Sequence, residues 1–286
     1  HKEYRRQRQM CIRDSLKETD FMDLGISGRV AIITGGSGGI GFATAKLLAL
    51  EGVKLVLSDR QQADVDDAAG IIGGDAMAVA ADVTSQADVD ALVSRTIETF
   101  GTVDIVVHTS GITGGKGDPL ELSDEEYQEA WAVDFMSAVR IGRAAIPQMR
   151  QGGWGRFVCI TSENAVQPYW EEATYNAAKA ALAAFIKGLS YKEAANGVLC
   201  NTVAPAFIET PMTDGMMKKR AEEMNITFDE AVRTFLDEER PGIVQKRRGK
   251  PEEVAAAIAL LVSDRASFIN GANLRVDGGS VLAIQS

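Results

Sequence analysis

The sequence predicts an α/β fold built on a doubly wound parallel sheet. Seven short apolar runs recur along the chain, and they are continuous rather than alternating, as strands covered on both faces require. Helix-length segments separate the runs, which implies right-handed crossovers between parallel strands. Strands are therefore expected at residues 30–33, 54–57, 77–80, 105–107, 157–160, 199–203 and 273–276.

Several of the intervening helices carry start signals. Helices are expected over residues 41–50 and 87–100, the second with Ser85 as its N-cap. Ser123 and Glu126 have the spacing of a capping box, which predicts the start of a third helix. Helices that alternate with strands in this way cover both faces of one sheet.

The domain organisation is expected to be simple. No internal repeat, low-complexity tract or linker divides the chain, so a single domain is predicted over residues 21–286. Residues 1–20 are basic and polar and change character abruptly, which predicts a disordered or foreign N-terminal tail. An organelle-targeting peptide is the alternative for that segment.

One stretch departs from the strand–helix alternation. Residues 212–245 are charged and helical in pattern, and Thr227 and Glu230 form another capping box. An insertion between two strands, at about residues 207–245, predicts a helical substrate lid, with a solvated pair of surface helices as the alternative. Its apolar side chains and two aromatic ones nearby indicate an apolar or ring-bearing substrate, unless they are core: Met212, Met216, Met217, Phe235, Tyr169 and Trp170.

Composition excludes several classes of function. The chain has 286 residues, and 45% hydrophobic content is ample for a buried core. A formal net charge of -10 argues against nucleic acid or an anionic membrane as partner, because such binders concentrate Lys and Arg. No apolar stretch approaches the roughly 18 residues that a membrane helix needs.

Cysteine and histidine usage bears on compartment and metal content. The three cysteines are an odd number, and Cys159 and Cys200 lie in apolar runs, so reduced thiols and a cytoplasmic location are expected. The two histidines, His1 and His108, lie far apart in sequence and have no Cys-x-x-Cys companion. No metal site is predicted.

A glycine-rich turn follows the first expected strand and opens an apolar helix. Gly36, Gly38 and Gly41 fit G-x-G-x-x-G, while Gly35, Gly39 and Gly41 fit the wider spacing T-G-x-x-x-G-x-G. In both registers, glycines let the backbone approach a pyrophosphate, which helix N-terminal N–H groups then meet. No Lys-Ser/Thr pair follows, which excludes a P-loop. A Rossmann-type dinucleotide site is therefore predicted.

Carboxylates at the ends of the next two strands indicate which dinucleotide binds. Asp59 follows Gly41 by eighteen positions, where a carboxylate accepts hydrogen bonds from the ribose hydroxyls and repels a 2′-phosphate. NAD is therefore expected. Arg60 could instead pair with a 2′-phosphate, which keeps NADP as the less favoured alternative. Asp82 closes the third strand and starts an Asp-Val-Thr string. Its carboxylate is a candidate cofactor contact, and the alternative is an ordinary entry from a strand into a helix.

The string Tyr175-Asn-Ala-Ala-Lys179 carries the chemistry. Four residues apart on a helix, the phenol and the ammonium share one face. A nearby cation favours phenolate and brings a pKa of about 10 closer to the working pH of a general acid/base. Ser162 lies thirteen residues upstream, at the end of an expected strand.

Over about residues 25–284 the chain resembles the classical short-chain dehydrogenase/reductase family. The resemblance rests on the glycine turn, on Ser162, on Tyr175 with Lys179, and on motifs at residues 82–84, 201–205, 210–212, 251–254 and 276–279. It implies that Tyr175 exchanges a proton with the substrate oxygen, that Ser162 orients the carbonyl, and that Lys179 binds the nicotinamide ribose and lowers the Tyr175 pKa. It also implies a homo-oligomer, a dimer or tetramer.

The resemblance further implies a set of cofactor-binding residues along the carboxyl edge of the sheet. They are Gly35, Ser37, Gly39, Ile40, Gly41, Asp59, Arg60, Asp82, Val83, Thr109, Gly111, Tyr175, Lys179, Ile208 and Thr210.

The chain departs from the family pattern at three places. His108-Thr-Ser-Gly111 replaces Asn-Asn-Ala-Gly, although Gly111 itself is retained. Asp134 replaces the asparagine of a proton relay and so loses the amide donor; it is counted among the catalytic residues, with a purely structural role as the alternative. Ala206 replaces a glycine and restricts the turn beside the nicotinamide.

Together these features predict an NAD(P)-dependent oxidoreductase that moves a hydride between nicotinamide and a small-molecule secondary alcohol or ketone. A dinucleotide-binding sensor or scaffold without turnover is one alternative. Such a binder has no use for Tyr175, Lys179 and Ser162 together. The other alternative keeps the fold but acts as a dehydratase or epimerase.

Overall fold

The computed structural model describes residues 22–74 and 76–284. The tail expected at residues 1–20 therefore lies outside the described residues. Among the helices that are described, none is long and apolar enough to cross a membrane.

The core of the molecule is one seven-stranded sheet in the order β3-β2-β1-β4-β5-β6-β7, and every neighbouring pair is parallel. Each apolar run expected as a strand lies within one of these strands, so the predicted doubly wound α/β fold is confirmed. The strands are β1 Val30–Thr34, β2 Lys54–Asp59, β3 Met77–Ala80, β4 Ile105–His108, β5 Gly155–Ile160, β6 Val198–Pro205 and β7 Asn273–Val276.

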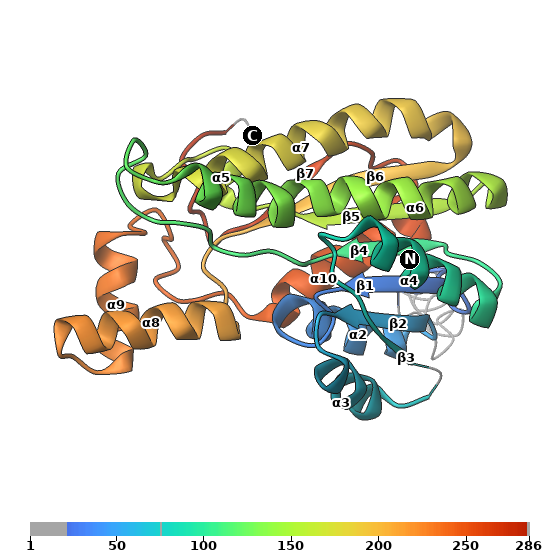
Figure 1. Cartoon of the computed structure of the whole chain (residues 1–286), viewed down its shortest axis with the longest axis horizontal. Helices are drawn as coiled ribbons and strands as arrows, with labels where there is room; N and C mark the ends of the chain where they lie inside the picture. The colour runs from blue at the N-terminus through green and yellow to red at the C-terminus, as the bar shows by residue number, and fades with distance from the viewer. Residues whose placement is uncertain (1–21, 75, 285–286) are drawn as a thin grey trace, which may run out of the picture.

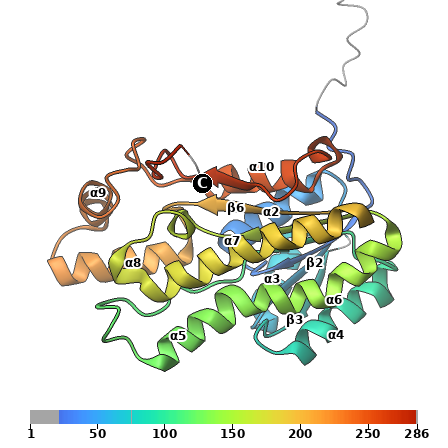
Figure 2. The ribbon, with the colours of Figure 1, turned by 90° about the horizontal axis from the view of Figure 1, so that it is seen from above.

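Helices cover both faces of the sheet (Figures 1 and 2). Along β1, Ala31 and Ile33 pack among α2, α3 and α10, whereas Ile32 faces the core under α4, α6 and α7. This alternation gives each face a separate apolar core. The helices are α2 Gly39–Leu50, α3 Gln62–Ile72, α4 Gln86–Phe100, α6 Ser137–Gly152, α7 Ala173–Glu193 and α10 Pro251–Val262.

The predicted capping signals form as expected. The Ser85 side chain accepts a hydrogen bond from the Asp88 amide at the start of α4. Ser123 and Glu126 make a reciprocal capping box at the start of α5, Asp124–Ala130. Such caps satisfy backbone N–H groups that have no partner within the helix.

Two features place the functional site. The chain passes from β3-β2-β1 to β4-β5-β6-β7, so the topology switches between β1 and β4, where a ligand crevice opens beyond the carboxyl ends of the strands. After β6, helices α8 (Pro211–Met224) and α9 (Phe228–Glu238) extend beyond this edge of the sheet (Figure 1). They pack on a small apolar cluster of their own: Phe207, Met217, Phe235, Leu236 and Ile243.

Candidate active site

A cavity of about 690 Å³ lies over the carboxyl ends of strands β1 to β6. Of the predicted site residues, only Gly41 and Asp134 do not line it. Those that do are Gly35, Ser37, Gly39, Ile40, Asp59, Arg60, Asp82, Val83, Thr109, Gly111, Ser162, Tyr175, Lys179, Ile208 and Thr210. Residues from six strand ends therefore share one continuous wall.

The glycine turn fits the close approach of a diphosphate. Gly35 has a φ of +67°, which a residue with a side chain rarely adopts, and a Cβ atom at Gly41 would overlap the Gly35 carbonyl oxygen. Gly38 is the N-cap of α2, and no side chain among the described residues makes a capping hydrogen bond there. The first N–H groups of α2 thus remain available to an anion.

The far end of the cavity carries two carboxylates. Asp59 accepts hydrogen bonds from the Ser37 hydroxyl at 2.6 Å and from the Arg60 amide at 2.8 Å. Asp82 accepts hydrogen bonds from both the hydroxyl and the amide of Thr84, at 2.7 and 2.8 Å, and these bonds hold its pKa below the ordinary value. A ribose and an adenine fit between such acceptors.

Tyr175, Lys179 and Ser162 meet at the opposite end of the cavity. Helix α7 places Lys179 Nζ 5.5 Å from the centre of the Tyr175 ring, and Ser162 follows the end of β5. Burial raises the pKa of Tyr175, while the Lys179 ammonium opposes that rise without outweighing it. The phenol is therefore protonated near neutral pH and can act as an acid. The sequence predicts a lowered pKa for Tyr175 instead, and the structure differs because burial outweighs the cation.

Asp134 forms a buried ion pair with Lys179. Asp134 Oδ1 lies 3.2 Å from Lys179 Nζ and accepts the Ile112 amide at 3.1 Å. Lys179 Nζ also donates to the Ile160 carbonyl at 3.1 Å. Burial raises the pKa of Asp134 against the opposing effect of the ammonium. Burial alone would lower the pKa of Lys179, but Asp134 and Tyr175 outweigh it and raise that pKa.

The backbone around Asp134 is unusual. Residues Trp131–Met136 form a π-helical segment between α5 and α6, and Asp134 sits inside it. Such segments are frequent at functional sites. A Cβ atom at Gly111 would lie 2.7 Å from Asp134 Oδ1, so the retained glycine leaves room for the carboxylate. Neither the π-helical segment nor this contact has a signal in the sequence.

His108, the first residue of the altered motif, lies in the core. Its two ring nitrogens are 2.7 Å from the Thr34 hydroxyl and 2.8 Å from the Ser137 hydroxyl. Burial, with a smaller effect from Lys179, lowers the pKa of His108 to about 3, so the ring is neutral. The first residue of the altered motif therefore lies in the interior, and the next three, Thr109, Ser110 and Gly111, line the cavity.

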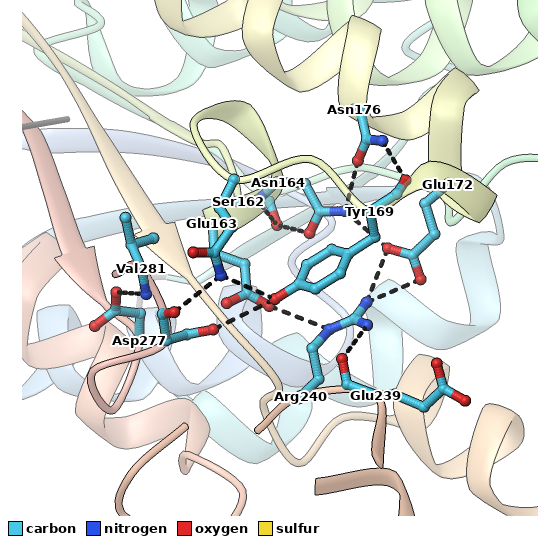
Figure 3. A network of polar contacts seen from close by, with 12 residues as sticks. Ser162, Glu163, Asn164, Tyr169, Glu172, Asn176, Glu239, Arg240, Asp277 and Val281 are labelled. Atoms are coloured by element: carbon cyan, nitrogen blue, oxygen red, sulfur yellow. Dashed lines mark hydrogen bonds and ion pairs between the residues drawn. The ribbon is translucent and has the colours of Figure 1, made fainter. Parts of the chain in front are cut away.

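Sequence reasoning missed the polar network behind Ser162 (Figure 3). The Ser162 hydroxyl donates to Asn164 Oδ1 at 3.0 Å, and the Asn164 amide group donates to Glu172 at 2.7 Å and to Asn176 at 2.8 Å. Arg240 donates to both oxygens of Glu172 at 2.9 Å. A single sequence gives no sign of this network because its members lie up to 78 residues apart, the separation of Ser162 and Arg240.

Arg240 connects this network to the helices that follow β6. It lies two residues after α9 ends, with its guanidinium 3.5 Å from the centre of the Tyr169 ring and its Nε 3.3 Å from Glu163. Of the apolar residues expected to face a substrate, Met212, Met216 and Phe235 line a second cavity next to Ser162 and Tyr175. Met217 belongs to the apolar cluster of α8 and α9 and lines an outer cavity.

Comparison with known proteins gives a consistent result. A family model described as enoyl-(acyl carrier protein) reductase matches residues 35–281. The chain is 35% identical to cis-4-hydroxycyclohexanecarboxylate dehydrogenase of Sinomonas cyclohexanicum, over 88% of this chain and 96% of that protein.

Two solved structures are similar in fold and sequence. L-sorbose reductase of Gluconobacter frateurii, complexed with NADPH and L-sorbose, has a TM-score of 0.87 and 36% identity over 92% of this chain and all of that one. A 3-ketoacyl-(acyl-carrier-protein) reductase of Brucella melitensis, complexed with NADH, has a TM-score of 0.80 and 32% identity over 90% of this chain and all of that one. From its sheet order, its cavity and these matches, the chain belongs to the classical short-chain dehydrogenase/reductase family.

Proposed function

We propose that the chain transfers a hydride between the nicotinamide of NAD and a secondary alcohol or ketone, with Tyr175 as the general acid/base. As a family member it is an NAD(P)-dependent oxidoreductase that acts on alcohols and ketones. One observation carries the finer proposal. Tyr175, Ser162 and Lys179 line one end of a cavity, and the glycine turn and Asp59 line its other end.

The nicotinamide supplies or accepts the hydride when it is bound. In ketone reduction, Tyr175 donates its phenolic proton to the substrate oxygen, and the Ser162 hydroxyl turns from Asn164 to donate a hydrogen bond to the same oxygen. In alcohol oxidation the two steps reverse. The Lys179 ammonium stabilises the phenolate that remains.

Asp134 does not line the cavity and acts through Lys179. Its contact with Lys179 keeps the ammonium charged and fixed in the wall of the cavity, because a buried cation needs a paired anion. Lys179 in turn holds the Ile160 carbonyl next to Ser162. Asp134 is thus proposed as a positioning residue, not as a group that touches the substrate.

The choice of NAD over NADP rests on Asp59. Its carboxylate lines the cavity and repels the 2′-phosphate that distinguishes NADP. Arg60 lines the same end and works in the opposite direction. Similar solved proteins are complexed with NADPH in one case and NADH in the other, so the residues of this chain must decide.

The remaining proposals concern partners and location. Relatives named for a ring alcohol and for a ketose support a small-molecule alcohol or ketone as substrate. A cytoplasmic location is proposed from the cysteines that the structure describes, Cys159 and Cys200, which are free thiols. Assembly into a homo-oligomer is proposed from the family alone.

The absorbance of reduced nicotinamide tests this function directly. The purified chain is incubated with NAD and alcohols, and with NADH and ketones, from cyclic, sugar, steroid and acyl classes. We expect a net change with at least one class. Binding of cofactor with no change for any class would indicate a sensor, and product formation without a net change would indicate a dehydratase or epimerase.

A further inference from the structure

His108 is a buried titratable group that the proposed mechanism does not use. It ends β4 beside Thr34, the last residue of β1, and only 1% of its surface is exposed. Nδ1 lies 2.7 Å from the Thr34 hydroxyl, and Nε2 lies 2.8 Å from the Ser137 hydroxyl. Ser137 begins α6 directly after the π-helical segment Trp131–Met136. The ring therefore connects the sheet to the end of that segment.

The direction of these hydrogen bonds follows from the number of protons. The Ser137 hydroxyl has one proton and donates it to the Val133 carbonyl, four residues back. It can therefore only accept from His108, so Nε2 carries the ring proton. The ring is neutral because burial lowers its pKa to about 3, which leaves Nδ1 to accept from the Thr34 hydroxyl. A directed chain runs from Thr34 through His108 and Ser137 to the Val133 carbonyl.

This chain ends one residue before the buried ion pair. Asp134 follows Val133, and its Oδ1 contacts Lys179 and accepts the Ile112 amide. Ile112, like His108, belongs to the stretch at the end of β4. That stretch thus holds the π-helical segment at two points, at Asp134 through an amide and at its far end through the imidazole. The hydroxyl-to-carbonyl bond at the far end is of a kind that often bends a helix.

The ion pair depends on the exact course of this segment. Asp134 Oδ1 lies 3.2 Å from Lys179 Nζ, and Oδ2 has no hydrogen-bond partner among the described residues. A buried pair compensates for its lost hydration only when its geometry is kept. A small displacement of the segment would lengthen the one contact that offsets the buried charge.

We propose that His108 is a positioning residue, whose ring, protonated at Nε2, fixes the π-helical segment so that Asp134 meets Lys179. This inference rests on the proposed function, in which Lys179 supports Tyr175, and adds a residue that acts through Asp134. It also connects two of the departures from the family pattern, His108 and Asp134, in one arrangement.

Two substitutions separate the two contacts of the ring. An asparagine amide reaches about as far as Nδ1, and a glutamine amide about as far as Nε2. His108→Asn should therefore keep a partner for Thr34 and lose the donor to Ser137, so kcat should fall by about tenfold, or roughly 1.4 kcal/mol. His108→Gln restores that donor and should recover most of the loss. The Kd for NAD should stay within about twofold in both variants, since the buried ring does not line the cavity.

The pH–rate profile gives a readout that a loss of packing alone would not change. The Lys179 ammonium opposes the rise of the Asp134 pKa, so a looser contact lets that pKa rise further. The acidic limb of kcat should therefore move to higher pH in His108→Asn and return in His108→Gln. Tyr175 on α7 and Cys159 on β5 also face the pair, but their pKa values are raised, and that of His108 is lowered. The limb thus reports Asp134.

A double-mutant cycle tests whether His108 acts through Asp134. His108→Asn should lower kcat about tenfold in the wild-type background and by less than about twofold in Asp134→Asn, where its target is gone. The same cycle in the free energy of unfolding, measured with denaturant, should show coupling without any need for turnover. Thr96→Val is the control, because it removes a buried hydroxyl that bonds a carbonyl four residues back, that of Leu92 in α4. Its effect on stability should be equal in both backgrounds, with kcat unchanged.

Nuclear magnetic resonance of histidine reads the proton position directly. The chain has two histidines, His1 and His108, so protein labelled with 15N at histidine gives two sets of ring signals, and His108→Gln identifies one. We expect His108 to show the Nε2–H tautomer and no titration from about pH 5 to about pH 8.

The outcomes decide between positioning and simple packing. An equal loss of kcat in both backgrounds would overturn the proposal, and so would an unmoved acidic limb in His108→Asn or an Nδ1–H tautomer. Should His108→Asn fail to fold, Ser137→Ala removes the same link and carries the same expectations. No turnover of any alcohol or ketone by the wild type would contradict the proposed function, whereas the tautomer and the unfolding cycle would still decide whether His108 holds Asp134.

Discussion

At the scale of single residues, the most informative position is Asp134. The family pattern places asparagine there, and this chain places a carboxylate in a buried contact with Lys179. Asp134 Oδ2 has no hydrogen-bond partner among the described residues, so the ammonium is the main compensation for the buried charge. The pair therefore links the protonation of Asp134 to the electrostatics of the catalytic end.

Asp134→Asn should change the acidic limb of the pH–rate profile. Burial raises the pKa of Asp134 above its ordinary 3.8, so on acidification it takes up a proton earlier than an ordinary aspartate would. Protonation of Asp134 removes the charge that stabilises the Lys179 ammonium, so wild-type kcat should fall on the acidic limb. Asparagine cannot titrate, so this fall should be absent in the variant. The nearly isosteric variant should remain folded. A profile of kcat against pH that superimposes on wild type would leave Asp134 a purely structural residue.

Asp59 should decide the cofactor preference. Asp59→Ala removes the carboxylate that repels a 2′-phosphate, so the ratio of kcat/KM for NAD over NADP should fall by about tenfold or more, or roughly 1.4 kcal/mol. Arg60→Ala is the matched control and should increase that ratio, because it removes the competing cation. Equal or better use of NADP by the wild type would refute the assignment.

At this scale the sequence predicted what contiguous motifs encode. Tyr175 and Lys179 share a helix face because of their spacing, and Ser162 follows a strand, so all three could be predicted. The support of Ser162 by Asn164 could not, because it depends on Glu172 and Arg240, which the fold brings together from distant segments. The direction of the Tyr175 pKa shift could not be predicted either, because burial outweighs the effect of the cation that the sequence reveals.

At the scale of elements, Arg240 fastens the α8–α9 segment to the polar network behind Ser162. Its guanidinium contacts Glu172 and Glu163 and stacks on Tyr169, and Glu172 holds Asn164, which holds Ser162. Docking of the end of α9 and orientation of the serine hydroxyl therefore share one network.

Arg240→Lys should lower kcat and stability together while leaving cofactor affinity unchanged. Lysine keeps the charge but loses the planar fork that reaches both oxygens of Glu172. We expect a loss of at least about 1 kcal/mol in the free energy of unfolding, within the range for disturbed buried ion-pair networks. Arg220→Lys is the control, since its partners Glu238 and Glu239 are exposed and such pairs contribute about 0–1 kcal/mol. Equal effects of the two variants would show that Arg240 is not coupled to Ser162.

The glycine turn at the start of α2 makes a second prediction at this scale. Gly41→Ala should weaken cofactor binding, because its Cβ would overlap the Gly35 carbonyl oxygen and lie 2.7 Å from Thr109 Oγ1. The turn must shift to admit the methyl group, which displaces the first N–H groups of α2 from a diphosphate, so the Kd for NAD should rise by roughly tenfold or more, or about 1.4 kcal/mol. Gly70→Ala in α3 meets no atom within 4 Å and should leave the Kd unchanged. A wild-type Kd in Gly41→Ala would mean that the turn is not the diphosphate site.

Element boundaries show how far sequence patterns reach. Apolar runs located every strand, and capping residues located the starts of α4, α5 and α9, because both signals are local. The π-helical segment Trp131–Met136 has no such signal. Its sequence is compatible with a continuous α-helix, and its packing against α7 is a contact between distant segments that no local pattern records.

At the scale of the whole molecule, the arrangement follows from the parallel sheet. Six strand ends converge on one edge, so residues from positions 35 to 213 contribute to one cavity. The proposed cofactor site and the proposed catalytic group occupy opposite ends of that cavity, and α8 and α9 extend beyond the same edge (Figure 1). The central claim of this account is that Tyr175 moves the proton at the catalytic end.

Comparison of Tyr175→Phe with wild type tests that claim most directly. The ring is retained, so the Kd for NAD should stay within about twofold, while kcat should fall by roughly 10²–10⁴-fold, the contribution of general acid–base catalysis. The two quantities are measured on the same preparation, by titration of NAD and by formation of reduced nicotinamide with the best alcohol. A Tyr175→Phe variant that keeps more than about a tenth of wild-type kcat would contradict the account, because another group would then supply the proton.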